Sequence, residues 1–121
     1  MAQANLQGSN INLVKQHNIQ AILLNLLYEP GLSRSHLAKQ TNLSNTTITN
    51  LIAELIEQGI VREKVANSDE QEMLRPVGRP RTSVCLEPNA RFVIGVHIGI
   101  GIFRVATANL RSEIIHSQVY S

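Results

Sequence analysis

Apolar residues recur at helical spacing through most of the first sixty positions of the chain. Between residues 10 and 28 they lie three or four positions apart, and Pro30 and Gly31 follow as stop signals. The apolar positions of this stretch are 13, 14, 19, 22, 23, 26 and 27. The pattern predicts a first helix over about residues 10–28, preceded by a disordered N-terminus over residues 1–9.

A second, shorter helix is predicted over about residues 33–40. Ser33 is a favourable N-cap because its hydroxyl can accept a hydrogen bond from a backbone N–H of the first turn. Leu32 before the cap and Leu37 after it have the spacing of a hydrophobic staple, which fixes how the chain enters a helix. The polar pair at residues 41–42 ends this helix.

The same signals open a third helix a few residues later. Ser44 is the cap, and Leu43 and Ile48 form the staple. Gly59 ends the helix, because a left-handed C-terminal position costs glycine little. The apolar stripe of this helix consists of Ile48, Leu51, Ile52, Leu55 and Ile56. Two stapled helices joined by a short turn are typical of a helix-turn-helix.

The pattern then changes to strands. Residues 60–66 and 82–87 alternate well enough for two strands, with a polar loop between them. A helix-turn-helix followed by such a hairpin is a winged helix, which we predict over residues 10–87. Three further strand-like runs, at about 92–97, 101–108 and 113–120, predict an antiparallel meander that begins a second domain over residues 88–121. The expected fold class is therefore α+β.

Composition narrows the classes of function. The chain has 121 residues, of which 43% are apolar and 3% aromatic, so its core depends on Ile, Leu and Val. Scarce aromatic residues disfavour a base-stacking single-strand binder. The formal net charge is only +2, yet the acidic run Asp69, Glu70 and Glu72 gives way to a purely basic stretch. This local segregation predicts a basic tip on the loop between the two wing strands.

Other chemistry is weakly represented. The single Cys85 cannot form an intrachain disulfide and is expected to be a buried structural thiol. We find no metal-ligand cluster, and we predict no catalytic residue, cofactor or metal site. The first ten residues lack a signal-peptide pattern, and no apolar run is long enough to span a bilayer. A cytoplasmic protein is expected.

The face of the third helix opposite its apolar stripe predicts readout of DNA bases. It carries short, uncharged hydrogen-bonding side chains, whereas a solvated helix face more often carries Glu, Lys and Gln. Asn can pair with adenine through two hydrogen bonds, and a Thr methyl can contact a thymine methyl. The alternative is ordinary soluble surface. The predicted readout residues are Asn45, Thr46, Thr47, Thr49 and Asn50.

Phosphate contacts are predicted around the two caps, because the second helix of this motif crosses the DNA backbone. The candidates are Arg34, Ser35, Lys39 and Ser44. His36 is expected to complete the local cap rather than to contact DNA.

The wing loop contains the stretch PVGRPRT at residues 76–82. It is either a linker or a contact, and its Gly-Arg-Pro core is typical of chains that place arginines in a narrow A·T-rich minor groove. Its position beside a reading helix favours the contact. The candidate minor-groove residues are Arg75, Gly78, Arg79 and Arg81.

Together these features resemble the ROK family of sugar-responsive transcriptional repressors. The resemblance covers the chain from about residue 10 to its end, and its most specific element is the order helix-turn-helix, Gly-Arg-Pro, Leu-x-x-Asn, then a strand entering a glycine turn. It implies that residues 88–121 begin an actin-like, ribonuclease H-like ATPase fold, here incomplete. It also implies a palindromic double-stranded operator, a possible homodimer, and a sugar or sugar-phosphate inducer bound only by a full-length form.

Two alternatives remain. One is a sugar kinase fragment of the same superfamily, but the kinases have an Asp-x-Gly-Gly-Thr turn near the ATP phosphates, where this chain has His97 for the Asp and Ile100 for the second Gly. A neutral imidazole cannot replace that carboxylate near Mg²⁺, and a β-branched residue obstructs close approach of a phosphate. The other alternative is a truncated interaction module that pairs with a full-length relative through exposed strands.

Overall fold

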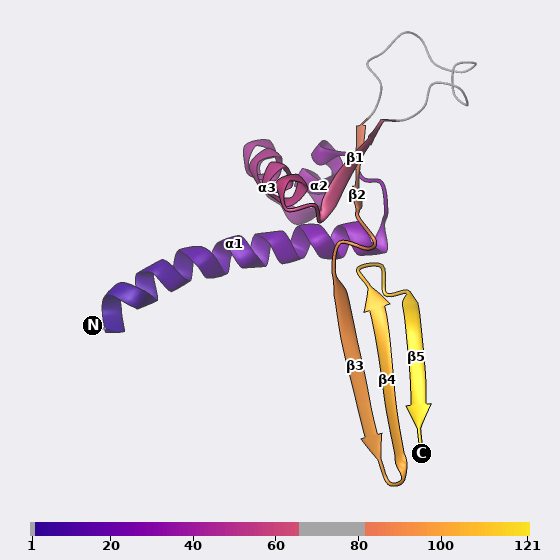
Figure 1. Ribbon diagram of the computed structural model, residues 1–121. Helices are drawn as coiled ribbons and strands as arrows, with labels where there is room; N and C mark the ends of the chain where they lie inside the picture. Colours follow the sequence, from indigo (N-terminus) through magenta and orange to yellow (C-terminus); the bar gives the residue numbers. More distant parts are fainter. Residues whose placement is uncertain (1, 66–81) are drawn as a thin grey trace, which may run out of the picture.

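The computed structural model describes residues 2–65 and 82–121, with side chains from residue 11 onward (Figure 1). Three helices lead into five strands, which confirms the α+β class. The elements are α1 (Ala2–Tyr28), α2 (Arg34–Thr41), α3 (Asn45–Glu57), β1 (Val61–Val65), β2 (Thr82–Leu86), β3 (Phe92–Gly99), β4 (Ile102–Asn109) and β5 (Ile114–Tyr120).

Helix α1 begins earlier than its apolar periodicity predicts. The sequence predicts disorder over residues 1–9, whereas the structure continues the helix through residues 2–9. Those positions hold Ala, Gln and Leu, which favour a helix, and no proline, so nothing in them stops the helix from extending. At 27 residues, α1 is about 40 Å long.

The predicted caps are confirmed. The Ser33 hydroxyl accepts a hydrogen bond from the backbone N–H of His36 at 3.2 Å, and the Ser44 hydroxyl accepts one from Thr47 at 3.1 Å. Helix α2 ends in a left-handed Asn42, and the left-handed Gly59 follows α3 with φ of +74°. The two caps fix where α2 and α3 begin, and therefore which residues lie on their first turns.

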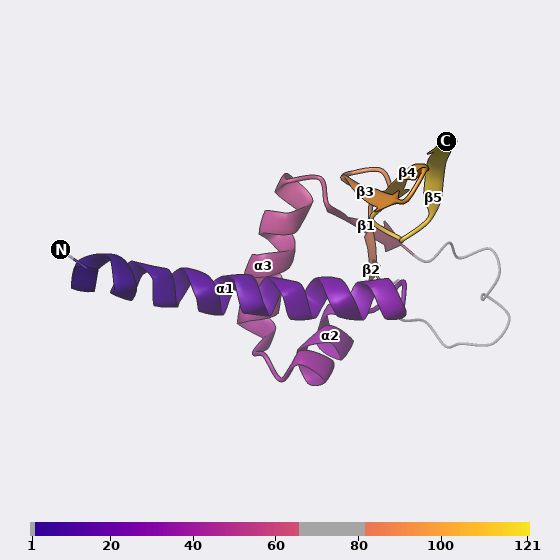
Figure 2. The ribbon, with the colours of Figure 1, turned by 90° about the horizontal axis from the view of Figure 1, so that it is seen from below.

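One apolar core joins the three helices to the wing. Helix α1 lies across α3 (Figure 2), and the interior is entirely apolar among the described residues. The fully buried side chains are Ile22, Leu26, Leu37, Ile48, Ile52, Leu55 and Val84. Both predicted staples are seen, because Leu32 and Leu37 are buried, as is Ile48, with Leu43 packed against the core.

Strands β1 and β2 form the predicted wing. They pair antiparallel from Val61 opposite Leu86 to Val65 opposite Thr82. The backbone N–H of Val84 also donates to the carbonyl of Leu32 at 2.7 Å, so the segment before α2 forms a bridge with β2. The wing loop, with Arg75, Gly78, Arg79 and Arg81, lies outside the described residues.

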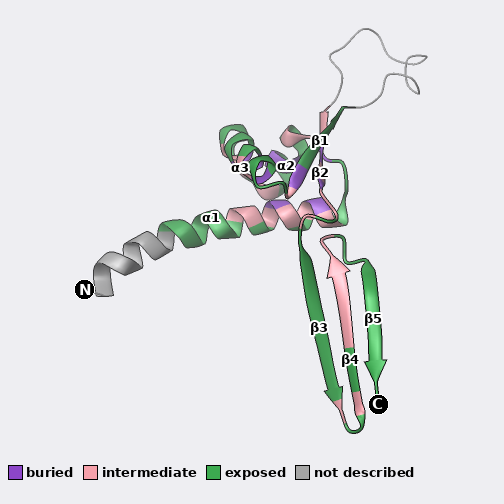
Figure 3. Ribbon diagram, viewed as in Figure 1, coloured by how far each residue is buried: buried purple, intermediate pink, exposed green. Residues whose placement is uncertain are grey.

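Strands β3, β4 and β5 form the predicted antiparallel meander in that order. Gly101, with φ of +66°, turns β3 into β4. The meander extends away from the helices on the other side of α1 from the wing strands (Figure 1), and most of its residues are exposed (Figure 3). Its turn after β4 contacts the chain that leaves the wing, since the N–H of Leu110 donates to the carbonyl of Pro88 at 3.0 Å.

Candidate nucleic-acid interface

Helix α3 has one buried face and one exposed polar face. Ile48, Leu51, Ile52 and Leu55 turn toward the core. At 100° per residue, Thr46 and Asn50 lie opposite that stripe. The predicted readout residues that the structure leaves exposed are Asn45, Thr46, Thr49 and Asn50.

The fifth predicted readout residue, Thr47, is placed differently. It is half-buried, and its hydroxyl lies 2.8 Å from the hydroxyl of Ser44. That Ser44 hydroxyl also accepts the backbone N–H of Thr47. The hydrogen bonds of this pair are therefore made within the cap, although Ser44 itself remains exposed beside the helix N-terminus. A helix N-terminus favours a phosphate, because its free N–H groups and its dipole attract an anion.

The C-terminal half of the same helix is acidic. Glu54 and Glu57 line a shallow polar hollow with Asn50 and Ala53. Lys15 on α1 pairs with Glu54 at 2.8 Å. Carboxylates repel DNA phosphates, so the arrangement favours contact through the first two turns of α3 rather than through its end.

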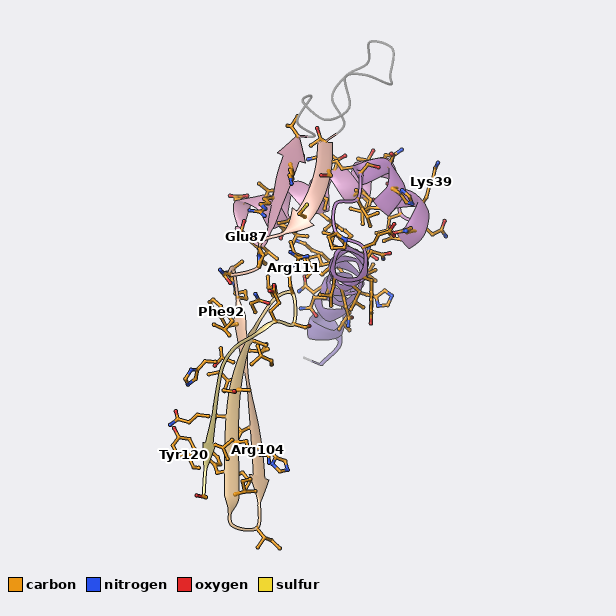
Figure 4. All side chains as sticks on the ribbon, turned by 90° about the vertical axis from the view of Figure 1, so that its right-hand side faces the viewer. Lys39, Glu87, Phe92, Arg104, Arg111 and Tyr120 are labelled. Carbon is orange, nitrogen blue, oxygen red and sulfur yellow. The ribbon has the colours of Figure 1, made fainter. Side chains whose placement is uncertain are left out.

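The phosphate contacts predicted on α2 differ in whether their side chains are free or paired within the fold. Ser35 and Lys39 are exposed, and the Lys39 side chain extends away from the fold (Figure 4). Arg34 instead forms an ion pair with Glu63 on β1, and its Nε is buried. His36 is exposed, and its backbone N–H completes the cap of α2 as predicted.

Strand β1 carries two exposed cations, Arg62 and Lys64, and Lys64 lies next to the end of the strand where the loop begins. Arg62 lies 3.5 Å from Glu87. Lys64 was not among the predicted contacts, although the alternation of VREKV could have indicated that it faces outward. Cys85, opposite Arg62, is half-buried rather than buried, so the prediction of a fully buried thiol is wrong.

The glycine turn of the meander is a tight hairpin. A Cβ at Gly99 would lie 2.9 Å from a methyl carbon of Ile102, and Ile100 is fully exposed at the tip. His97 lies opposite Arg104 across the strand pair. Within residues 2–65 and 82–121, no group of three His, Cys, Asp or Glu residues lies close enough together to hold a metal ion. Nor is any helix of this part long and apolar enough to cross a membrane.

This architecture is similar to that of known proteins. Residues 16–62 match a family described as winged helix-turn-helix DNA-binding. The xylose repressor of Caldicellulosiruptor bescii is 27% identical over 109 residues, which cover 90% of this chain and 26% of the repressor. The DNA-binding transcriptional dual regulator NagC of Escherichia coli is 28% identical over 114 residues, covering 94% of this chain and 27% of that protein.

A solved structure shares the fold. The crystal structure of a ROK family transcriptional regulator, a homologue of the E. coli MLC protein, superposes with a TM-score of 0.68 at 20% identity. It matches 89% of this chain and 26% of that one, so the chain spans about a quarter of the length of these relatives. Residues 16–62 therefore resemble a family of DNA-binding winged helix-turn-helix domains, and the resemblance of the chain to the ROK family of transcriptional regulators is confirmed.

Proposed function

We propose that the protein is a sequence-specific transcriptional regulator that represses sugar-utilisation genes. The observation that carries this proposal is the exposed, uncharged Thr and Asn face of α3, directly opposite the buried stripe of the same helix. In the proposed complex the first turns of α3 enter the major groove. Asn50 accepts from and donates to adenine, and the methyl groups of Thr46 and Thr49 contact thymine.

The phosphate contacts of this complex surround the reading helix. Ser44 lies at the N-terminus of α3, and Ser35 and Lys39 approach the backbone from α2. Arg79 and Arg81 of the wing loop enter the adjacent minor groove, with Arg75 and Gly78 beside them. This last part of the proposal rests on the sequence, because the paired ends of β1 and β2 locate only where the loop begins and ends.

The control of the regulator is inferred from its relatives. One of them is named a xylose repressor, and a further relative, from Escherichia coli O6:H1 and 28% identical, is named an N-acetylglucosamine repressor. We therefore infer a sugar or sugar phosphate as inducer, bound by a form of the protein longer than residues 1–121. A homodimer on a palindromic operator is the arrangement that this class of motif uses to place two reading helices one helical turn apart.

Replacement of Asn50 by Ala tests the readout. Duplexes are first enriched from a random-sequence pool with the wild-type chain, and binding is then measured by fluorescence anisotropy. We expect Asn50→Ala to weaken binding to the enriched duplex about tenfold, because loss of one bidentate base contact costs 1–3 kcal/mol. Binding to a scrambled duplex should change less than twofold.

Asn12→Ala is the matched control, since Asn12 is an exposed amide on α1 and is not among the residues proposed to contact DNA. It should bind both duplexes as the wild type does. Failure of the wild-type chain to enrich any duplex sequence would refute sequence-specific binding, and equal losses with Asn50→Ala on both duplexes would refute the role of α3 in base readout.

A further inference from the structure

The ion pair between Arg34 and Glu63 joins the two DNA-contacting parts of the fold. Arg34 is the first residue of α2, and Glu63 is the middle residue of β1. The two side chains are 38% and 36% exposed, so the pair is partly open to solvent. The Arg34 Nε is buried without a hydrogen-bond partner. One edge of the guanidinium is therefore covered by the fold, and its Nη2 is paired with Glu63.

Glu63 lies on the face of β1 that also carries Val61 and Val65, and this face opens to solvent toward the loop, since Val65 is 55% exposed. Glu63 lies directly opposite Val84, which is fully buried, and two residues beyond Val61, which is buried as well. Directly opposed residues of an antiparallel pair share one face of the sheet. A carboxylate here loses part of its hydration on the side that faces the wing, and its partner Arg34 offsets part of that loss.

The same part of the wing has a second, backbone link to α2. Val84, opposite Glu63, donates its N–H to the carbonyl of Leu32, two residues before Arg34. The two links together hold the middle of the wing against the start of α2. From there β1 continues only to Val65 before the loop begins, so the angle set at Glu63 determines where the loop leaves the fold.

We propose that Arg34 and Glu63 are positioning residues: their ion pair fixes the angle of the wing relative to the reading helix, and Arg34 does not itself contact DNA. This inference rests on the proposed function, since it concerns how α3 and the wing engage one duplex together. It replaces the sequence-based prediction of Arg34 as a phosphate contact.

Variants that neutralise one charge of the pair distinguish a positioning role from a purely electrostatic effect on DNA binding. Glu63→Gln removes a negative charge, so electrostatics alone would strengthen binding to DNA. If the pair positions the wing, Glu63→Gln instead weakens binding to the enriched duplex, by about three- to fivefold for a half-exposed pair. Arg34→Gln should weaken binding as well, but the loss of its positive charge alone would have the same sign, so Glu63→Gln is the discriminating variant. The charge swap R34E/E63R keeps the net charge of the wild type and should restore affinity to within about twofold.

Glu54→Gln is the matched control. Glu54 is also 36% exposed and is paired with Lys15, but it joins α1 to α3 rather than the wing to α2. It should bind the enriched duplex as tightly as the wild type or more tightly. Thermal melts of all variants report whether they fold. If Glu63→Gln has a lower melting temperature than the wild type, the affinity of the charge swap R34E/E63R tests the positioning role in its place.

The outcomes distinguish this inference from the proposed function. Absence of any enriched duplex with the wild-type chain would refute both. If the wild type enriches a duplex and Glu63→Gln matches Glu54→Gln, the positioning role is refuted. A lower salt slope for Arg34→Gln, by about one unit, together with no rescue by the charge swap, would likewise refute it and identify Arg34 as a phosphate contact.

Discussion

The winged helix-turn-helix and the meander are built from similar apolar residues but bury them very differently. In the first, side chains from all three helices and both wing strands meet in one core, where Ile52 is fully buried. In the meander, Ile94 is 69% exposed and Ile98 77% exposed. Even the aromatic contact between Phe103 and Tyr120, with ring centroids 5.7 Å apart, lies at the surface.

This difference in burial follows from the number of layers of secondary structure in each part. A strand or helix becomes stable when its apolar face is covered by a second layer, and the helices supply that layer for the wing. The meander is a single layer of three strands within the described residues, so β3 and β5 remain exposed along nearly their whole length, and β4 between them is mostly half-buried. Apolar content alone therefore does not tell which part of a chain contributes to stability.

Truncation of a core side chain should have the largest effect on the free energy of unfolding. Ile52→Ala should lower the free energy of unfolding by about 3 kcal/mol, because it removes buried methyl and methylene groups and leaves a cavity. Ile94→Ala, the same substitution at an exposed position of the meander, should lower it by less than about 0.5 kcal/mol. Urea unfolding followed by circular dichroism at the helix band measures both. Equal losses would show that the meander is covered in solution.

A smaller effect is expected at the caps. Ser44→Ala should cost about 1 kcal/mol of unfolding free energy, because the N–H of Thr47 loses its hydrogen-bond acceptor at the start of α3. Ser117→Ala, at an exposed position of β5, is the control and should be near neutral. The same urea titration applies, and a neutral Ser44→Ala would contradict the role of this cap.

A substitution in the meander should have the smallest effect on stability. It should, however, change the association of the chain. Ile98→Lys should change the free energy of unfolding by less than about 0.5 kcal/mol, yet it should reduce self-association of the chain, because a charge interrupts an exposed apolar strand. Light scattering coupled to size-exclusion chromatography measures the mass. Unchanged association would show that the face carrying Ile98 does not contribute to it.

Local signals explain why most of the fold could be predicted from the sequence. Ser33, Ser44 and Gly59 act within one or two helical turns, so their positions in the chain suffice to locate the ends of α2 and α3. The position of the exposed face of α3 could be predicted from the apolar stripe of the helix alone. The order of the meander strands followed from short turns between alternating runs.

Features that depend on distant partners could not be predicted in this way. Arg34 has the residue type and position of a phosphate contact, and only the fold shows that Glu63, on another element, pairs with it. The half-buried state of Cys85 depends on which face of β2 the helices cover. The start of α1 was missed for the opposite reason, because residues 2–9 carry neither a clear stop nor a clear periodic pattern.

The bridge between Leu32 and Val84 also has a consequence for the order in which the protein forms. Its two residues are 52 positions apart (84 − 32), whereas the contacts of α2 with α1 and with α3 join elements that follow one another in the chain. Local contacts form faster than those that must close a long loop. During synthesis, all three helices are translated before β2. We therefore expect the reading helix to be assembled first and the wing to be attached to it as a later event.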